Sequence, residues 1–182
     1  GEKEVQLRFL EEDQSAFLAD LKREHPAYYN LKYVQSPVSR SEIQAQLAAD
    51  EALLSYFLRK DQLYILVLGK KQGSLTKVAL DTSLQDLVNT LRTSMDQHSE
   101  MRSPSSQVAK QHAQGYCSAA YTLYQQVFQP VEADLPQKVK IIPDGPLAFV
   151  PFDALISEMP ERVEDFRSHA YLLHRFQFSY TR

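Results

Sequence analysis

The sequence has few of the residues on which several kinds of protein chemistry depend. Its single cysteine, Cys117, excludes an internal disulfide framework, agrees with a reducing compartment and leaves no CxxC motif for zinc. Its five glycines are scattered, so neither a glycine-rich phosphate loop nor a Gly-x-Ser-x-Gly nucleophile elbow is present. The longest apolar runs span about six residues, far below the roughly 20 that a membrane-spanning helix needs. The sequence therefore predicts no membrane segment.

The net charge is also small, although the charged content of 24% is ordinary for a globular protein. The 182 residues carry a net charge of -3, with no basic stripe that would indicate a nucleic-acid partner and no acidic tail. The sequence begins with the charged stretch Gly1-Glu2-Lys3-Glu4 and lacks the apolar core segment of a signal peptide. A hydrophobic content of 43% is enough to build the core of one domain, or of one domain with an appended helix. We expect a cytoplasmic protein that binds neither nucleic acid nor a cofactor.

An amphipathic helix is predicted over residues 4–24, and Pro26 ends it. Its apolar stripe consists of Leu7, Leu10, Phe17 and Leu21. Such a stripe must pack against something. The helix is either a cap on the domain that follows or the last helix of an upstream helical array. The tyrosine-rich segment 28–33 is interpreted as a connector with its hydroxyls at the surface, rather than as a ligand platform.

Three strands over 53–58, 62–68 and 75–80 are expected to form an antiparallel meander, because the connections between them are short. The middle strand is apolar at every position from Leu63 to Leu68. A strand of that kind is typical of a sheet that is covered on both faces.

Helices are predicted around this meander. The segment 39–42 has the serine-to-glutamate spacing of a capping box and starts a short helix. A second helix begins near Thr82, and a polar loop is expected over 97–106. A third helix is predicted from Ser103 to Phe128, with Val108 on its apolar face.

The stretch 139–155 is the most distinctive part of the sequence. Residues 139–142 predict an interior strand, and Pro143-Asp144-Gly145 has the residues of a tight turn. An apolar segment over 147–152 returns from this turn, and a helical turn follows over 152–155. Residues 175–180 alternate strictly and predict a strand. Because the sequence stops two residues later, we expect a truncated sheet with an exposed edge there, at which a second copy of the chain could pair. The predicted fold class is α/β, a mixed sheet with flanking helices.

Several side chains are of types that carry chemistry, but each also suits a structural role. Cys117 lies in the middle of a predicted helix among small residues, which favours packing over catalysis, and His112 is poorly spaced to act with it. No two of the five histidines have the three- or four-residue spacing of helical zinc ligands. Convergence of His98, His112 and Cys117 on a metal through the loop is the weaker alternative.

The carboxylates Asp144 and Asp153 flank the central apolar segment. They could act as an acid and base pair if a hairpin brought them together. The favoured interpretation is that Asp144 forms the turn and Asp153 caps the helical turn. The residues themselves therefore assign no catalytic, cofactor-binding or metal-binding side chain.

The central stretch resembles the CHAT domain, a caspase-like domain often found after tetratricopeptide repeats. The likeness begins with Ile141 to Leu147, continues through Val150 to Leu155, and includes the terminal segment Tyr171 to Tyr180. Earlier matches in the same order are Leu53 to Phe57, Leu63 to Val67, and the residues Leu123-Tyr124 with Pro130-Val131. The likeness covers most of the chain from about Pro26 onward.

The resemblance implies that residues 26–182 are the N-terminal portion of a CHAT domain, an incomplete caspase-like α/β domain. The catalytic histidine and cysteine of that family have no matching position here, and Cys117 falls in a different element. The intact domain would resemble caspase- and gingipain-type cysteine peptidases, or a scaffold relative without activity. Expected partners are an upstream tetratricopeptide array joined through residues 1–25, the missing C-terminal half, and a second copy paired at the sheet edge.

Overall fold

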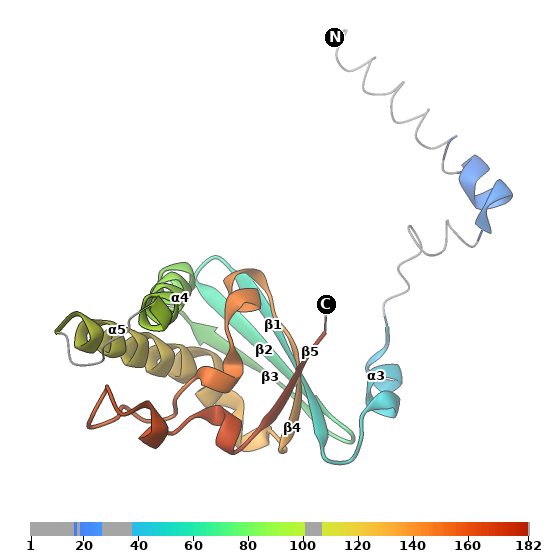
Figure 1. Ribbon diagram of the computed structural model, residues 1–182. Coiled ribbons are helices and arrows are strands. Elements are labelled where there is room, and N and C mark those ends of the chain that lie inside the picture. Colours follow the sequence, from blue (N-terminus) through green and yellow to red (C-terminus); the bar gives the residue numbers. More distant parts are fainter. Residues whose placement is uncertain (1–16, 18, 27–37, 101–106, 182) are drawn as a thin grey trace, which may run out of the picture. The chain divides into compact units, whose positions relative to one another are not determined.

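The computed structural model describes residues 17, 19–26, 38–100 and 107–181, except for the side chains of 97–100 (Figure 1). The chain divides into two compact units, Gly1–Glu42 and Ile43–Arg182. In the first unit, residues 17 and 19–24 are helical, which confirms that part of the predicted N-terminal helix. The rest of that helix and the tyrosine-rich segment 28–33 lie outside the described residues. No helix within the described ranges has both the length and the apolarity needed to cross a membrane.

The second unit is built on a mixed sheet of five strands in the order β3-β2-β1-β4-β5. The strands are β1 (Glu51–Arg59), β2 (Gln62–Gly69), β3 (Gly73–Ala79), β4 (Lys138–Ile142) and β5 (Gln177–Tyr180). The meander β1-β2-β3 is antiparallel, as predicted, whereas β4 pairs in parallel with both β1 and β5. With its flanking helices, this sheet confirms the α/β fold class.

Two long helices cover one face of the sheet. They are α4 (Leu84–Glu100) and α5 (Gln107–Leu123), and a π-helical turn η1 (Tyr124–Phe128) and a 3-10 helix η2 (Gln129–Asp134) continue the second. The Ser83 hydroxyl accepts the Asp86 N–H at 3.3 Å and begins α4. Two expectations fail here. Helix α4 continues through Glu100 instead of ending before Gln97, and Val108 is 52% exposed instead of facing the core.

The main core lies between the sheet and the pair α4 and α5, which Figure 1 shows together on one side of the strands. Helix α5 presents mainly small side chains to this core, including Ala113, Cys117 and Ala120. Small residues allow the two helices to approach closely. At Gly115, a Cβ atom would lie only 3.0 Å from the Ser94 hydroxyl of α4.

Helix α3 (Arg40–Gln46) lies on the opposite face of the sheet (Figure 1). The predicted capping box is confirmed, because Ser39 donates its N–H to the Glu42 carboxylate at 2.7 Å and accepts the Glu42 N–H at 3.3 Å. Hydrogen bonds from Ser39 hold the pKa of Glu42 below its usual value. The Gln44 side chain ties the helix to the β2–β3 turn by donating to the Gly69 carbonyl at 2.7 Å.

The cover that α3 provides on this face is partial. Leu47, Leu53 and Leu68 form a small buried cluster beside α3. Farther along β2, Tyr64 and Leu66 are only partly buried, whereas Leu63, Ile65 and Val67 on the other face are fully buried. The expectation that β2 is covered on both faces is therefore wrong at Tyr64 and Leu66.

The segment between β4 and β5 is built of 3-10 turns. They are η3 (Gly145–Phe149), η4 (Phe152–Ala154), η5 (Phe166–Ser168) and η6 (Leu172–His174). The helical turn predicted at Phe152 is confirmed. The apolar return segment is not a strand, because Gly145 and Pro146 start a 3-10 helix that contains Leu147. The terminal strand is shorter than predicted, since β5 begins at Gln177.

Candidate functional site

Cys117 is a packing residue in the folded chain. Its side chain is fully buried, and its sulfur faces the Val163 carbonyl at 3.9 Å. Burial raises the pKa of the thiol to about 11, so the thiolate that a nucleophile or metal ligand requires is scarce at neutral pH. The structure thus agrees with the structural interpretation of this residue.

Among the histidines whose side chains the structure describes, no metal-binding group is formed. Within the described ranges, no cluster of three or more histidine, cysteine, aspartate or glutamate side chains could hold a metal ion. The side chain of His98 lies outside those ranges. His112 sits on α5 with a buried Nδ1 that has no hydrogen-bond partner, and His174 is exposed in η6 rather than in the terminal strand.

His169 is the buried histidine that the sequence analysis did not single out. It is 2% exposed, packs between the rings of Phe166 and Tyr171 at 5.1 and 5.6 Å, and leaves Nε2 without a hydrogen-bond partner. Its Nδ1 lies 3.4 Å from the Tyr171 hydroxyl. A single histidine within a charged, loop-like segment has no periodicity that could have marked it as buried.

Asp144 and Asp153 have separate structural partners. The Asp144 carboxylate accepts the Leu58 N–H at 2.7 Å and so fastens the turn after β4 to the end of β1. Asp153 lies inside η4 and makes no capping hydrogen bond, so the expected cap is wrong. Its carboxylate instead accepts a hydrogen bond from the Tyr180 hydroxyl at 3.3 Å.

The outer edge of β5 is the feature with the clearest capacity for binding. Gln177 and Thr181 donate their N–H groups to the carbonyls of Gln137 and Ile141, at 2.7 and 3.0 Å. Because main-chain groups alternate in direction along a strand, the N–H and C=O groups of Phe178 and Tyr180 point away from β4. Among the described residues, no strand pairs with that side of β5. The prediction of an exposed edge is confirmed.

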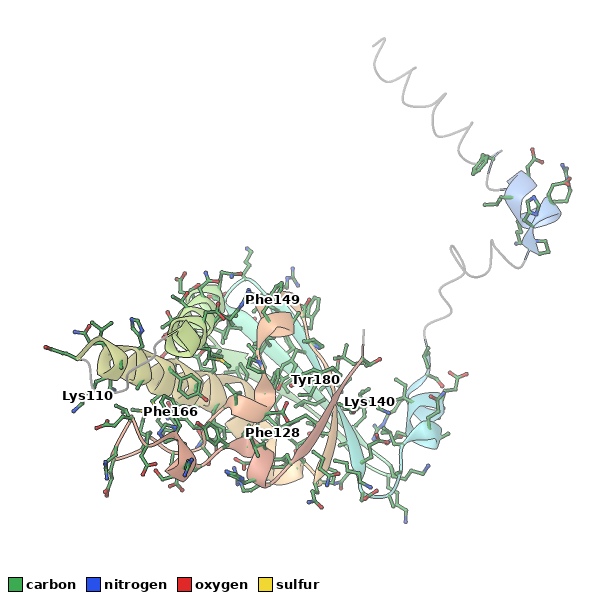
Figure 2. The ribbon with its side chains drawn as sticks, viewed as in Figure 1. Lys110, Phe128, Lys140, Phe149, Phe166 and Tyr180 are labelled. Atoms are coloured by element: carbon green, nitrogen blue, oxygen red, sulfur yellow. The ribbon has the colours of Figure 1, made fainter. Side chains whose placement is uncertain are left out.

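Aromatic side chains hold this edge in place. The Phe178 ring packs edge-on against Phe128 at 5.8 Å and also contacts Phe152 at 6.3 Å. Tyr180 accepts the Phe152 N–H at 3.1 Å, and burial raises the pKa of its hydroxyl to about 12. Figure 2 shows Tyr180 on β5 and Phe128 at the helical side of the sheet.

Two hollows that share Met95 lie between α4 and the turns η3, η4 and η6, and the first of them reaches β5 at Tyr180. The first has a volume of about 460 Å³ and is lined in part by Phe149 and Tyr180, which are 60% and 50% exposed (Figure 2). The second, of about 310 Å³, is lined in part by Tyr116 and Leu173. Met95 lines both. Free main-chain groups next to exposed apolar side chains suit recognition of an extended polypeptide better than a chemical reaction.

No family model matches the chain, and no curated protein sequence matches it.

Proposed function

We propose that the chain is the N-terminal portion of a CHAT domain that supplies the non-catalytic strands and helices of a caspase-like domain. The ordered sequence likeness from about Pro26 onward motivates this assignment. The observation that carries it furthest is the open edge of β5, next to the parallel strands β1 and β4. A further strand can continue the sheet there.

The position of chemistry in such a domain follows from strand direction. Because β1, β4 and β5 are parallel, their C-terminal ends share one edge of the sheet, near Asp144 and Tyr180. In sheets of this kind, ligands bind outside the C-terminal ends of the strands. A histidine and a cysteine on strands that follow β5 would meet at that edge, and the present residues would position them.

A covalent probe tests the proposal on the full-length protein. A peptidyl fluoromethyl ketone should label one cysteine other than Cys117, and substitution of one histidine elsewhere in the protein should abolish the labelling. The matched control is Cys117→Ala, which should leave the labelling unchanged because Cys117 is buried. Failure to label any cysteine, or labelling of Cys117 itself, would count against a peptidase.

The alternative is an interaction or scaffold module with no peptidase activity. It is favoured by the open β5 edge together with the buried, packing role of Cys117. The partners under this proposal are an upstream tetratricopeptide array, a C-terminal half that extends the sheet, and a second copy at the β5 edge. The proposal includes a cytoplasmic location, with which the single cysteine agrees.

A further inference from the structure

We propose that the sheet face opposite α4 and α5 binds a partner helix whose apolar stripe is flanked by acidic side chains. The binding surface consists of Phe57, Tyr64, Leu66 and Leu75, and we call it the open sheet face. It lies on β1, β2 and β3, whereas the function proposed above concerns the edge of β5.

Strand pairing brings these four side chains together. Phe57 pairs with Tyr64 and Leu66 with Leu75, and the rings of Phe57 and Tyr64 are 6.2 Å apart. Side chains alternate between faces along a strand, and the neighbours Tyr56 and Ile65 belong to the main core.

The four side chains therefore lie on the other face. Phe57 is 59% exposed and Leu75 is 67% exposed, which is unusual for two large apolar side chains on one sheet surface.

The composition of β2 indicates that a further layer of structure packs on this face. A strand that is apolar at every position is typical of a sheet with a layer on each side. Ile43 of α3 and Leu47 just after it provide such a layer over Leu53 and Leu68 but leave Tyr64 and Leu66 partly exposed. A second helix beside α3 would continue the same layer and bury the remaining apolar surface.

The charges around the open sheet face select the partner. Arg59 and Lys77 are exposed and project from the same face as Phe57 and Tyr64. Lys77 pairs with Tyr64, and Arg59 lies two positions after Phe57 on β1, so each shares the face of its neighbour. The Lys77 ammonium group lies 5.8 Å from the centre of the Tyr64 ring. Among the described residues, no carboxylate is in ion-pair distance of Arg59 or Lys77, whereas Lys140, farther along the same face, is paired with Glu51 at 3.2 Å.

This local positive charge contrasts with the net charge of -3 for the whole chain. Acidic side chains on each flank of a helix would pair with Arg59 and Lys77 while its apolar stripe covers Phe57 and Leu75. Complementary charge of this kind mainly sets specificity and the association rate. Lys140, which is labelled in Figure 2, projects from the same face of the sheet, because it pairs with Leu53.

The test uses two labelled synthetic helices that share one leucine stripe. One carries glutamate on both flanks and the other carries lysine at the same positions. Fluorescence anisotropy with the whole chain should detect binding of the glutamate helix and much weaker binding of the lysine helix. Leu75→Glu should weaken the glutamate helix about tenfold or more, because an exposed anchor is replaced by a repelling charge. The double substitution Arg59→Glu with Lys77→Glu should reverse the preference.

The matched control is Phe149→Ser, which removes an equally exposed aromatic side chain beside the hollow near β5. It should leave the affinity for the helix unchanged. Circular dichroism verifies that each variant is folded, which is expected because the substituted residues Arg59, Leu75, Lys77 and Phe149 are all exposed.

Four outcomes would overturn the proposal. The first two are no binding of the glutamate helix and equal binding of both helices. The third is a loss of affinity for the glutamate helix in Phe149→Ser as large as that in Leu75→Glu. The fourth is that neither helix binds, whereas phosphatidylserine vesicles bind and Leu75→Glu abolishes their binding. A dimer that dissociates in Leu75→Glu, measured by sedimentation, would instead assign the open sheet face to a second copy of the chain.

Discussion

Two ionisable side chains, Cys117 and Tyr180, owe their altered acidity to burial more than to a charged neighbour. Burial raises the pKa of the Cys117 thiol to about 11 and that of the Tyr180 hydroxyl to about 12. A nearby carboxylate, Asp153, adds to the effect on Tyr180. Both groups are therefore neutral at physiological pH, and their roles are packing and hydrogen bonding.

The folded chain should protect Cys117 from thiol reagents. At pH 8, we expect the reaction with Ellman's reagent to be slower than in the urea-unfolded chain by a factor on the order of 100, because the folded thiolate fraction is small. Absorbance at 412 nm follows the reaction, and Cys117→Ala gives the background. A folded chain that reacts as fast as the unfolded one would contradict the buried position.

Tyr180 should make the chain sensitive to alkali. Its pKa is raised from 10 to about 12 in the folded state, so folding favours the neutral hydroxyl. The stability that this group contributes is present below pH 10 and is lost as the pH rises from 10 towards 12.

Urea unfolding of the wild-type chain and Tyr180→Phe, compared between pH 8 and pH 12, measures this contribution. The wild type should be more stable by about 1 kcal/mol at pH 8, from its hydrogen bonds with Phe152 and Asp153. That advantage should shrink above pH 10. An advantage that stays constant with pH would show that the hydroxyl does not ionise with a shifted pKa.

At the level of elements, the turn after β4 connects three parts of the fold. Pro143 and Asp144 follow the strand, Asp144 accepts the Leu58 N–H of β1, and Gly145 begins η3 with a φ of 54°. Only glycine adopts this left-handed conformation without steric cost. The turn thereby sets where η3 and Phe149 lie beside the β5 edge.

Gly145→Ala should destabilise the chain by about 1–2 kcal/mol through backbone strain. A Cβ at this position would meet Leu58 Cδ2 at 3.6 Å, an ordinary contact, so the cost arises from the φ angle rather than from a clash. The free energy of unfolding in urea measures the effect.

Gly69→Ala is the matched control for this substitution. Its Cβ would also find ordinary contacts, at 3.8 Å, and Gly69 has no positive φ. The control should cost less than Gly145→Ala. Equal costs for the two substitutions would argue against a strained backbone at Gly145.

For the molecule as a whole, the two edges of the sheet differ in character. Edge strand β3 carries the exposed, charged residue Lys77 and the half-buried polar residues Ser74 and Thr76. Lysine on an edge discourages pairing with another chain. Edge strand β5 carries Phe178 and Tyr180, whose outward main-chain groups are free to pair. Self-association should therefore occur at β5 and not at β3.

We expect a concentration-dependent dimer wherever no further strand covers β5. Two copies of β5 can pair antiparallel about an axis through Ser179, so that Phe178 and the partner's Tyr180 exchange both main-chain hydrogen bonds. The side chains of these residues would then form aromatic pairs across the strands. Sedimentation equilibrium of the chain measures the dimer.

Tyr180→Pro should abolish this dimer, because it removes an outward N–H that β4 does not use. Tyr180→Phe is its matched control: it loses the hydroxyl alone, keeps the N–H, and should still dimerise. A chain that stays monomeric at high concentration, or a dimer that survives Tyr180→Pro, would contradict pairing at this edge.

Much of the local structure could be read from short stretches of sequence. The Ser39–Glu42 cap and the strands around residues 53–58 and 62–68 form as expected. The turn predicted at Pro143-Asp144-Gly145 forms one residue later: Asp144 is extended, and its carbonyl accepts the Leu147 N–H at 3.2 Å across Gly145. Each is encoded by residues within a few positions of one another, through side-chain alternation, a capping hydrogen bond or a required φ angle.

Contacts between distant residues settled the rest. Burial of Cys117 and His169, the bond from Leu58 to Asp144, and the partial cover over β2 depend on packing between segments far apart in the chain. Leu63 to Leu68 is apolar throughout, yet only the arrangement of α3, α4 and α5 decides which of these side chains are buried. Apolar periodicity reports which side chains can be buried, whereas the free energy of burial depends on what actually covers them. Phe57 and Leu75 therefore stay exposed, although the apolar sequence of the neighbouring strand β2 is typical of a sheet covered on both faces.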